Sequence, residues 1–441
     1  MVNGERWTRR QFLATSTSAA VAVSAPAASS LPRSSVLGAN DTVRLGLIGC
    51  GPRGAGDLFR CLKEPKTQAV ALCDVDEARI AQAAERIGVT PDIYVDFRRV
   101  IDRTDIDAVI VGTPDHWHAI PALHAIRAGK DVYLEKPVGH TIHEGQVLVA
   151  AARKHDRVVE VGLQQRSGTI FQEAVRLVQS GKIGKVSRVH CFNAWNAISA
   201  PGTGRSQILE NLPDGPAPKG VDFDMWLGPA PKRPFNPNRF HWNYIYYWDY
   251  SGGMIIAWGV HLIDIVLLAM KSNGPRAVTT AGGRFVIHDA RETPDTAEVI
   301  LEFPEYTLTY SCRHGSSFPQ GSPRADHGIQ FWGDQATLLV NRFGYQIIPE
   351  GEGSEPRVSA KDLDNGDERH QRGFIESIRS RKAPVCSIEE GHRSTTACQL
   401  ANISYRTGRK ITWDPVKELI IGDPEASHYM TKEYRAPWSL V

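Results

Sequence analysis

The sequence predicts an α/β protein in two parts, an N-terminal doubly wound parallel sheet and a C-terminal α+β domain with a large, mainly antiparallel open sheet. Up to about residue 165, short apolar runs alternate with segments long enough for a helix, which is the pattern of βαβ units. After Gly184 the strand-like runs follow one another through turns, which favours an antiparallel sheet. The first group of runs is Val43–Ile48, Gln68–Cys73, Asp107–Gly112, Asp131–Glu135 and Val158–Gly162.

The second group of predicted strands and two late helices complete the expected elements. Thr141 and Glu144 form a capping box that predicts a helix start between the last two parallel strands. We expect a processed segment at 1–30, a nucleotide domain at 41–165, a substrate and oligomerisation domain at 166–425 and a tail at 426–441. The later strands are expected at Lys185–Asn196, Ala277–Ile287, Ala297–Phe303, Leu308–Arg313, Gly328–Phe331 and Thr337–Asn341, and the helices near His370–Arg381 and Gly391–Thr407.

A glycine-rich turn directly after the first strand predicts a dinucleotide site of the Rossmann type. Its glycines allow a tight turn, close approach of a pyrophosphate and close packing of helix on strand, and the helix start then faces the phosphates. The second strand ends at Asp74, twenty residues past the last glycine, where a carboxylate binds ribose hydroxyls and repels a 2′-phosphate. NAD is therefore expected rather than NADP. The turn residues are Gly49, Gly51, Pro52, Arg53 and Gly54.

The N-terminus carries the pattern of a twin-arginine export signal. Thr8–Leu13 contains the paired arginines, Ala14–Val23 is a weakly apolar stretch, and Ala25–Ala27 is a candidate cleavage site. The alternative is a disordered basic N-terminus that carries no targeting signal. We expect the twin-arginine machinery to export the folded protein to the periplasm or beyond.

Composition indicates an ordinary globular enzyme. A formal net charge of +2 over 441 residues gives no polybasic tract, so neither nucleic acid nor an anionic membrane is an expected partner. No stretch is long and apolar enough for stable membrane insertion. The seven cysteines lack CxxC pairs, and we expect free thiols.

A long irregular insert, 197–251, separates the two patterns and is rich in Pro, Gly, Asn and Trp. Long ordered loops with aromatic residues are often functional, and aromatic faces suit the apolar side of a sugar ring. The alternative is that these tryptophans pin the loop to the sheet.

Two polar stretches follow parallel strands, where open α/β sheets bind ligands. Thr113, Pro114 and His118 follow one strand, and Glu135-Lys136-Pro137 ends the next. With the glycine turn, the helix start Gly252–Asp264 and the Glu390–Arg393 stretch, their order and spacing resemble the Gfo/Idh/MocA family (glucose-fructose oxidoreductase and inositol dehydrogenase), over essentially the whole mature chain.

The resemblance implies roles for particular residues. It places Lys136 against the substrate and the nicotinamide, with a cis bond before Pro137, and His118 near the nicotinamide rather than on a metal. It makes Lys136 and His261 the catalytic pair, although the family's acid four residues before His261 is Ala257 here. It also implies a homodimer or homotetramer formed through open sheet faces. From the residues alone, the alternatives are that Lys136 is a surface lysine and that His261 is a core histidine.

Several other polar residues are candidates for substrate contact. Gln165 and Arg166 follow the last parallel strand, although Arg166 is equally suited to a structural ion pair. Asp249, Tyr250 and Trp258 lie close to Ala257 in sequence and are candidates to replace its acid. No metal is expected, because no carboxylate or cysteine completes a site with His116, His118 and His124.

Three functions remain open from the sequence. The first is an exported NAD-dependent oxidoreductase that acts on a hydroxyl or keto group of a sugar, glycoside or cyclitol, with a tightly bound nicotinamide. The second is an NAD-dependent glycoside hydrolase or lyase that oxidises the sugar, eliminates, hydrates and re-reduces. The third is a carbohydrate-binding protein without catalysis, which Ala257 suggests.

Overall fold

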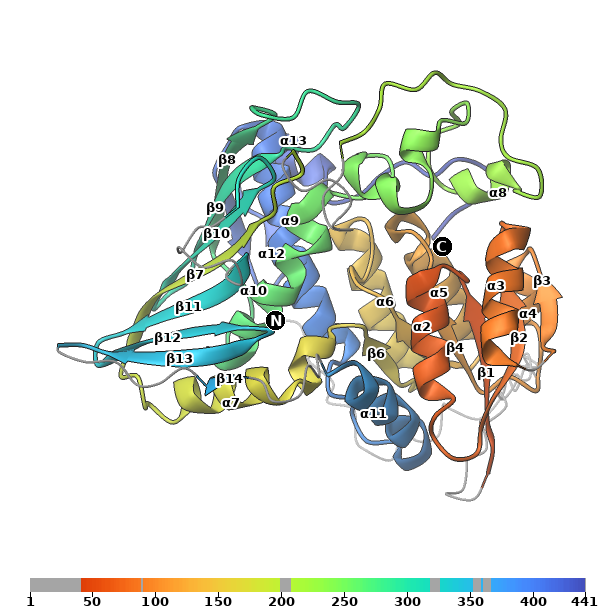
Figure 1. Ribbon diagram of the computed structural model, residues 1–441, viewed down its shortest axis with the longest axis horizontal. Coiled ribbons are helices and arrows are strands. Elements are labelled where there is room, and N and C mark those ends of the chain that lie inside the picture. The colour runs from red at the N-terminus through yellow and green to blue at the C-terminus, as the bar shows by residue number, and fades with distance from the viewer. Residues whose placement is uncertain are drawn as a thin grey trace, which may run out of the picture. The chain divides into compact units, whose positions relative to one another are not determined.

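The computed structural model describes residues 41–88, 90–198, 208–317, 326–351, 358–359 and 366–440 (Figure 1). The predicted export signal at 1–30 lies outside the described residues. Within the described ranges, no helix combines the length and apolar character needed to cross a membrane.

The first sheet has six parallel strands in the order β3-β2-β1-β4-β5-β6, as the sequence predicts for a Rossmann-type half. The order reverses between β1 and β4, so the edge formed by the carboxyl ends of these two strands is the switch point where ligands bind. The strands are β1 Val43–Ile48, β2 Thr67–Cys73, β3 Asp92–Tyr94, β4 Ala108–Val111, β5 Asp131–Leu134 and β6 Val159–Val161, and the helices are α2 Pro52–Cys61, α3 Glu77–Ile87, α4 Phe97–Ile101, α5 Ala119–Arg127 and α6 Ile142–His155.

Local sequence explains where α6 begins. The Thr141 hydroxyl accepts the amide of Glu144 at 3.3 Å, and the Glu144 carboxylate accepts the amide of Thr141 at 3.2 Å, so the predicted capping box is confirmed. The strands β4 and β5 are buried along their whole length, as expected for a parallel sheet covered on both faces.

The second sheet has ten strands in the order β14-β13-β12-β11-β7-β10-β9-β8-β15-β16. It is mainly antiparallel, as predicted, with one parallel pair between β7 and β10. The strands are β7 Val186–Ala194, β8 Ala277–Gly283, β9 Thr296–Glu302, β10 Thr307–Arg313, β11 His327–Gly333, β12 Ala336–Asn341, β13 Gly344–Pro349, β14 Val358–Ser359, β15 Ile411–Asp414 and β16 Leu419–Ile420.

One predicted strand is too long. The run Ala277–Ile287 leaves the sheet after Gly283, because the amides of Val286 and Ile287 donate to the Asp295 carboxylate instead of to a neighbouring strand. The side chain of Asp295 therefore satisfies the turn that follows β8.

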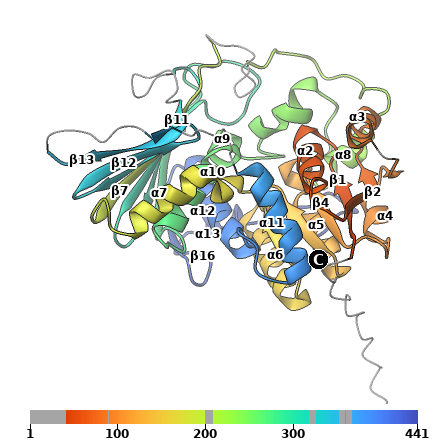
Figure 2. The same ribbon diagram turned by 60° about the horizontal axis from the view of Figure 1, so that its bottom comes forward.

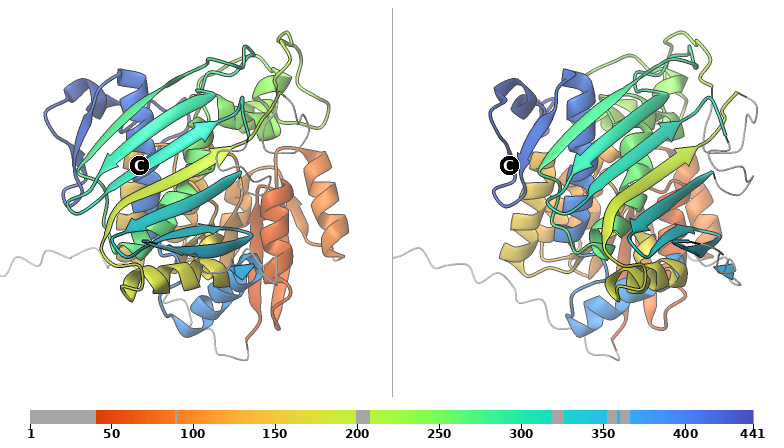
Figure 3. Two further views of the ribbon diagram at one scale, coloured as in Figure 1. Left: turned by 60° about the vertical axis from the view of Figure 1, so that its left-hand side comes forward. Right: turned by 90° about the vertical axis from the view of Figure 1, so that its left-hand side faces the viewer.

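Helices cover one face of the large sheet, while the views from its other side show no helix over it (Figures 2 and 3). The predicted helix start at Gly252–Asp264 forms two helices, α9 and α10, which meet at Trp258. The α-helices of this part are α7 Thr169–Gln179, α8 Phe223–Leu227, α9 Gly253–Ala257, α10 Gly259–Ala269, α11 Asp367–Ser380, α12 Ile388–Thr407 and α13 Pro424–His428, and the 3-10 helices of the chain are η1 Asp115–Trp117, η2 Gln164–Ser167, η3 Pro237–Arg239 and η4 His241–Tyr246.

The late helices join the two sheets. Gln371 on α11 donates to the buried Asp57 of α2 at 2.7 Å, and α12 packs against α6. The Trp438 ring lies 4.7 Å from that of Trp117, so the C-terminal segment also returns to the nucleotide-binding part. All seven cysteines are buried and unpaired.

A buried ion pair fixes α10 against η2. The Arg166 guanidinium donates to both oxygens of Asp264 at 2.8 and 2.9 Å and also pairs with Glu390 of α12 at 2.7 Å. Burial opposes the charge of Arg166, but Asp264 and Glu390, together with Cys386, outweigh burial and raise the pKa of Arg166 above its usual value. The pair therefore sets the position of the helix that carries His261.

We expect Asp264→Ala to lower the free energy of unfolding by about 3–5 kcal/mol, because it leaves a buried guanidinium without its main counter-charge. Urea denaturation followed by circular dichroism measures this loss. The double variant Arg166→Met/Asp264→Leu should recover most of it, since neither charge then remains. A loss below about 1 kcal/mol in the single variant would contradict this role.

Candidate active site

A cavity of 450 Å³ lies at the carboxyl ends of the parallel strands and is closed on its far side by α9, α10 and the insert. It brings together most of the residues that the sequence proposed for the cofactor and for catalysis. The predicted residues that line it are Gly49, Gly51, Pro52, Arg53, Asp74, Thr113, Pro114, His118, Glu135, Lys136, Trp258 and His261.

The glycine turn has the shape that a pyrophosphate requires. Gly49 has φ +94°, and a Cβ there would lie 2.6 Å from the Gly112 carbonyl carbon, while one at Gly54 would lie 2.2 Å from the Gly49 oxygen. A Cβ at Gly51 would meet no atom within 4 Å, so this glycine borders open space in the cavity. No side chain caps the start of α2, which leaves its first amides available to an anion. These residues fit NAD.

Asp74 ties the end of β2 to the glycine turn. Its carboxylate accepts the amides of Cys50 at 2.6 Å and Asp76 at 3.0 Å, and it lines the cavity. Burial raises the pKa of Asp74 to about 6, against the opposing effect of these amides. An ionised Asp74 has further lone pairs for ribose hydroxyls.

Glu135 is the centre of a buried charge network. Its Oε1 accepts Arg53 Nε at 2.8 Å and Gln164 Nε2 at 2.8 Å. Arg53 also pairs with Asp57 and Asp367, at 3.1 and 3.2 Å. Burial alone would raise the pKa of Glu135, but the charges of Arg53 and Lys136 lower it. Glu135 is therefore an anion that positions its neighbours.

Lys136 reaches across the cavity to the second part of the fold. Its Nζ donates to the carbonyl oxygen of Ala257 at 2.9 Å, and the Lys136–Pro137 bond is cis. Burial lowers the pKa of Lys136 below its ordinary value, although Glu135 and Asp115 oppose the shift. A lowered pKa makes the neutral amine, which can accept a proton, accessible.

His261 faces Lys136 across the same cavity. Burial lowers its pKa well below the ordinary value, and the positive charges of Lys136 and Arg342 lower it further. Among the described residues, none forms a hydrogen bond with its Nδ1. A neutral imidazole at this position offers a lone pair to a substrate hydroxyl.

Arg342 and Trp258 form one wall of the cavity, and of these two residues the sequence predicted only Trp258. The Arg342 guanidinium lies 4.5 Å from the Trp258 ring, and both residues line the cavity. Gln165 does not line it. Its amide lies instead between the His261 carbonyl oxygen, at 2.7 Å, and Arg342 Nε, at 3.1 Å, with its nitrogen toward the carbonyl. Arg342 lies after β12, and no local motif marks it.

The insert covers the end of the cavity next to Asp74. His241 Nε2 lies 3.1 Å from the Asp76 carboxylate, and the amide of Asp222 donates to the carbonyl of Val75 at 2.9 Å. Trp242 and Tyr244 line the cavity from the same segment. The insert therefore lies over the side where the ribose and adenine of NAD would bind.

Several predicted residues have other roles. Arg166 forms the buried ion pair with Asp264, so the structural alternative for it holds. Asp249 pairs with Arg233, and the buried Tyr250 ring packs against His116 and Trp226 at 5.1 and 4.9 Å. The remaining predicted residues that do not line the cavity are Gly54, which packs under Gly49, and Pro137, which borders a smaller cavity.

The histidines after β4 bond to the backbone. His118 lies between the carbonyl oxygens of Pro137 and Thr113, at 2.5 and 2.8 Å, and His116 Nε2 donates to that of Trp226 at 3.0 Å. In the part of the chain that the structure describes, no group of three or more metal-binding side chains occurs.

Comparison with protein families identifies the class of protein. The model of the Gfo/Idh/MocA oxidoreductase family's NAD-binding Rossmann fold matches residues 43–163. The model of the family's C-terminal alpha/beta domain matches residues 167–290 and 348–440. The chain belongs to the Gfo/Idh/MocA oxidoreductase family.

Curated relatives include inositol 2-dehydrogenases. One from Saccharopolyspora erythraea is 34% identical over 190 residues, which cover 42% of this chain and 54% of the relative. One from Salmonella typhimurium is 28% identical over 162 residues, which cover 36% of this chain and 48% of the relative. The chain spans about half the length of the curated relatives it matches.

Solved structures share the fold at low identity. A levoglucosan dehydrogenase in complex with NADH and levoglucosan has a TM-score of 0.64 at 17% identity, over 84% of this chain and 99% of that one. The aldose-aldose oxidoreductase of Caulobacter crescentus, complexed with glycerol, has a TM-score of 0.63 at 19% identity, over 84% and 99%.

We expect NAD affinity to depend on the ionisation of Asp74. Its pKa is raised to about 6, so binding should be nearly full above about pH 7 and weaken as the pH falls through 6 and the carboxylate is protonated. Asp74→Asn should bind NAD more weakly at pH 8, by about 1.5–3 kcal/mol per lost charged hydrogen bond, and lose this pH dependence. Isothermal titration calorimetry measures both. Equal affinity for NADP, or a flat wild-type profile, would contradict the assignment.

We also expect NAD to leave slowly, because the insert covers its binding side. Protein purified without added cofactor should contain NAD by mass spectrometry of the denatured sample. His241→Ala should speed NADH release about 3–10-fold, as expected for loss of one hydrogen bond, in stopped-flow fluorescence. His428→Ala, outside the cavity lining, is the matched control. Empty wild-type protein with the same release rate as His241→Ala would refute the covering role.

Proposed function

We propose that this protein is an exported NAD-dependent oxidoreductase that acts on a hydroxyl or keto group of a sugar, glycoside or cyclitol. One observation carries the proposal: Lys136 and a neutral His261 line the same cavity as the glycine turn and Asp74. NAD bound at the turn would supply the hydride acceptor.

The residues at the inner end of the cavity suit the oxidation of a secondary alcohol. Lys136 donates a hydrogen bond to the reacting oxygen and stabilises negative charge that develops on it. His261, neutral because of burial, offers a lone pair to a hydroxyl group of the substrate and helps to position it. The negative charge of Glu135 lies beside the Lys136 amine and holds it in place.

A polyhydroxylated substrate matches the remaining walls. Trp258 presents an aromatic ring, which suits packing against the apolar face of a sugar ring. The Arg342 guanidinium adds hydrogen-bond donors for hydroxyl or carboxylate groups. The names of the relatives, inositol 2-dehydrogenase and levoglucosan dehydrogenase, support the same substrate class.

The insert favours a second candidate, an NAD-dependent glycoside hydrolase or lyase. A cofactor held under the insert does not exchange readily, and transient oxidation followed by re-reduction needs no exchange. Oxidation at one sugar carbon acidifies the neighbouring C–H, which permits elimination of the glycosidic group. In this reaction the nicotinamide ends in the oxidation state in which it began.

Export and assembly complete the proposal. The paired arginines at Thr8–Leu13 support export of the folded, cofactor-loaded protein by the twin-arginine machinery to the periplasm or outside the cell. The face of the large sheet that no helix covers in Figure 3 supports a homodimer or homotetramer built through that face.

We expect Lys136→Met to lower turnover by about 10²–10⁴-fold while NAD content stays unchanged, because the amine acts on the reacting oxygen. The assay follows absorbance at 340 nm with levoglucosan, myo-inositol and glucose, and nitrophenol release with nitrophenyl glucosides. Lys63→Met, at an exposed lysine outside the cavity lining, is the control.

Absorbance at 340 nm and nitrophenol release distinguish the two candidate functions. NADH accumulation supports the oxidoreductase, whereas nitrophenol release without NADH would replace it with the hydrolase or lyase. Normal turnover in Lys136→Met would remove this residue from the mechanism in both cases.

A further inference from the structure

A chain of hydrogen bonds leads from the main cavity to a second, smaller cavity behind it. The Tyr244 hydroxyl, which lines the main cavity, donates to Asp115 Oδ1 at 2.8 Å. The Ser251 hydroxyl donates to the other oxygen of the same carboxylate, Oδ2, at 2.5 Å. Asp115 and Ser251 both line the smaller cavity. The Asp115 carboxylate therefore lies between the two cavities and links them through its hydrogen bonds.

We propose that Tyr244 and Asp115 form a proton relay that carries the proton of the substrate hydroxyl out of the main cavity, with Tyr244 as a catalytic residue. The inference rests on the proposed function, since it concerns a proton released when an alcohol is oxidised. Asp115 acts through Tyr244 as the next acceptor of the proton, and Ser251 positions the Asp115 carboxylate.

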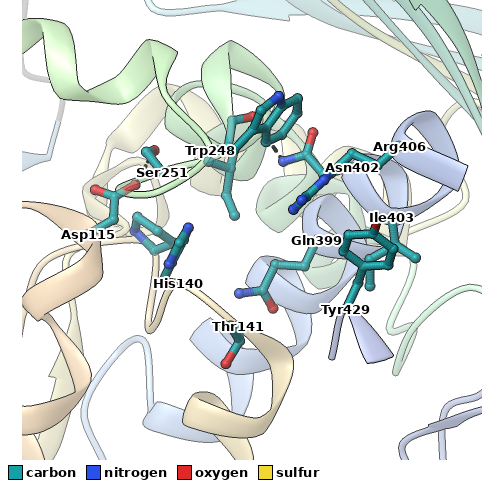
Figure 4. A pocket seen from close by; sticks show the side chains of 13 residues that line it. Asp115, His140, Thr141, Trp248, Ser251, Gln399, Asn402, Ile403, Arg406 and Tyr429 are labelled. Carbon is teal, nitrogen blue, oxygen red and sulfur yellow. Dashed lines mark hydrogen bonds between the residues drawn. The ribbon is translucent and has the colours of Figure 1, made fainter. Parts of the chain in front are cut away.

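The smaller cavity has both polar and apolar groups in its lining and has room for water. Figure 4 shows Asp115 and Ser251 together at one end, with His140 beside them and Gln399 and Asn402 opposite. Its volume of 40 Å³ holds about three water molecules. The Oε1 of Gln399 and the Oδ1 of Asn402 are buried and have no hydrogen-bond partner among the described residues. Such orphaned acceptors indicate a hydrated site.

The carboxylates that line the main cavity are already engaged. Glu135 is bound by Arg53 and Gln164, Asp74 by two backbone amides, and Asp76 by His241. Ala257 contributes only a carbonyl oxygen, which Lys136 uses. Tyr244 is different, because its hydrogen points to Asp115 and its oxygen keeps lone pairs that can accept from a substrate.

The relay balances as two linked proton transfers. The substrate O–H bond breaks as an O–H bond forms at Tyr244 Oη, and the original O–H bond of Tyr244 breaks as one forms at Asp115 Oδ1. NAD held by the glycine turn and Asp74 would supply the acceptor for the C–H electron pair and its hydrogen, as the proposed function requires. Water in the smaller cavity then takes the proton from Asp115, and the carboxylate is restored.

The surroundings of Tyr244 favour its protonated form, from which the relay begins. Burial raises the pKa of Tyr244 well above its ordinary value, and the charge of Asp115 raises it further. The phenol is therefore protonated at rest and donates to the Asp115 carboxylate. Asp115 also opposes the lowering of the pKa of Lys136, so the two groups are near enough to interact.

The test uses the full chain loaded with NAD and the probes levoglucosan, myo-inositol, glucose and methyl glucoside. Tyr244→Phe should lower kcat about 10²-fold, with KM changed less than about threefold, because the phenyl ring keeps the packing but cannot exchange a proton. Asp115→Asn should do the same, since its amide oxygen can still accept from Tyr244 but cannot take up the proton. Tyr246→Phe, on the same η4 helix and outside the cavity lining, is the matched control.

A proton inventory in H2O and D2O mixtures distinguishes a relay from a structural role. The wild-type rate should depend on the deuterium fraction along a curve, because two protons move together, and Asp115→Asn should give a straight line. NAD content and the thermal midpoint of each variant report on folding. Rates in Tyr244→Phe or Asp115→Asn within about threefold of the wild type would overturn the relay alone. A wild type that forms NADH with none of the probes would overturn the proposed function and the relay with it.

Discussion

The ion pair between Arg53 and the buried Glu135 is the interaction on which the site depends. It joins the first turn of α2, directly after the glycine turn, to the end of β5, at 2.8 Å. Gly162 leaves the space that this carboxylate needs, since a Cβ there would lie 2.3 Å from Glu135 Oε1. With one carboxylate oxygen committed to Arg53 and Gln164, Lys136 extends instead to the carbonyl of Ala257. The Arg53–Glu135 pair thus fixes the phosphate-binding turn and directs the Lys136 amine toward the opposite wall of the cavity.

The second part of the fold supplies that wall. The Arg166–Asp264 pair holds α10 in place, and Gln165 in the same 3-10 helix reaches both His261 and Arg342. A short segment after β6 therefore organises the catalytic end of the cavity without lining it. This explains why two residues proposed for substrate contact act as supports. A buried ion pair costs little folding free energy only when its two partners are held in a fixed geometry. Such pairs therefore favour a rigid arrangement around the reacting atoms.

The sequence predicted the features that depend on local pattern. The parallel strands, the glycine turn and the capping box of α6 follow from period and turn chemistry, whereas the placing of Lys136 and His261 on one cavity was implied by the resemblance to the Gfo/Idh/MocA family. Tyr244, Arg342 and Gln164 were missed, because their roles arise from contacts between distant segments. Asp249 and Tyr250 were proposed from their closeness to Ala257 in sequence. In the structure, Asp249 pairs with Arg233 and Tyr250 packs among aromatic rings, since the turn that precedes α9 directs them away from the cavity.

The central claim is that this cavity oxidises a polyhydroxylated substrate with NAD rather than merely binding it. A single-turnover experiment tests it most directly: protein loaded with one equivalent of NAD is mixed with levoglucosan, myo-inositol or glucose, and absorbance at 340 nm is followed. We predict a rise that corresponds to the bound NAD with at least one of these compounds. Compounds that bind by calorimetry but cause no change at 340 nm and undergo no chemical conversion would contradict the account and identify a carbohydrate-binding protein.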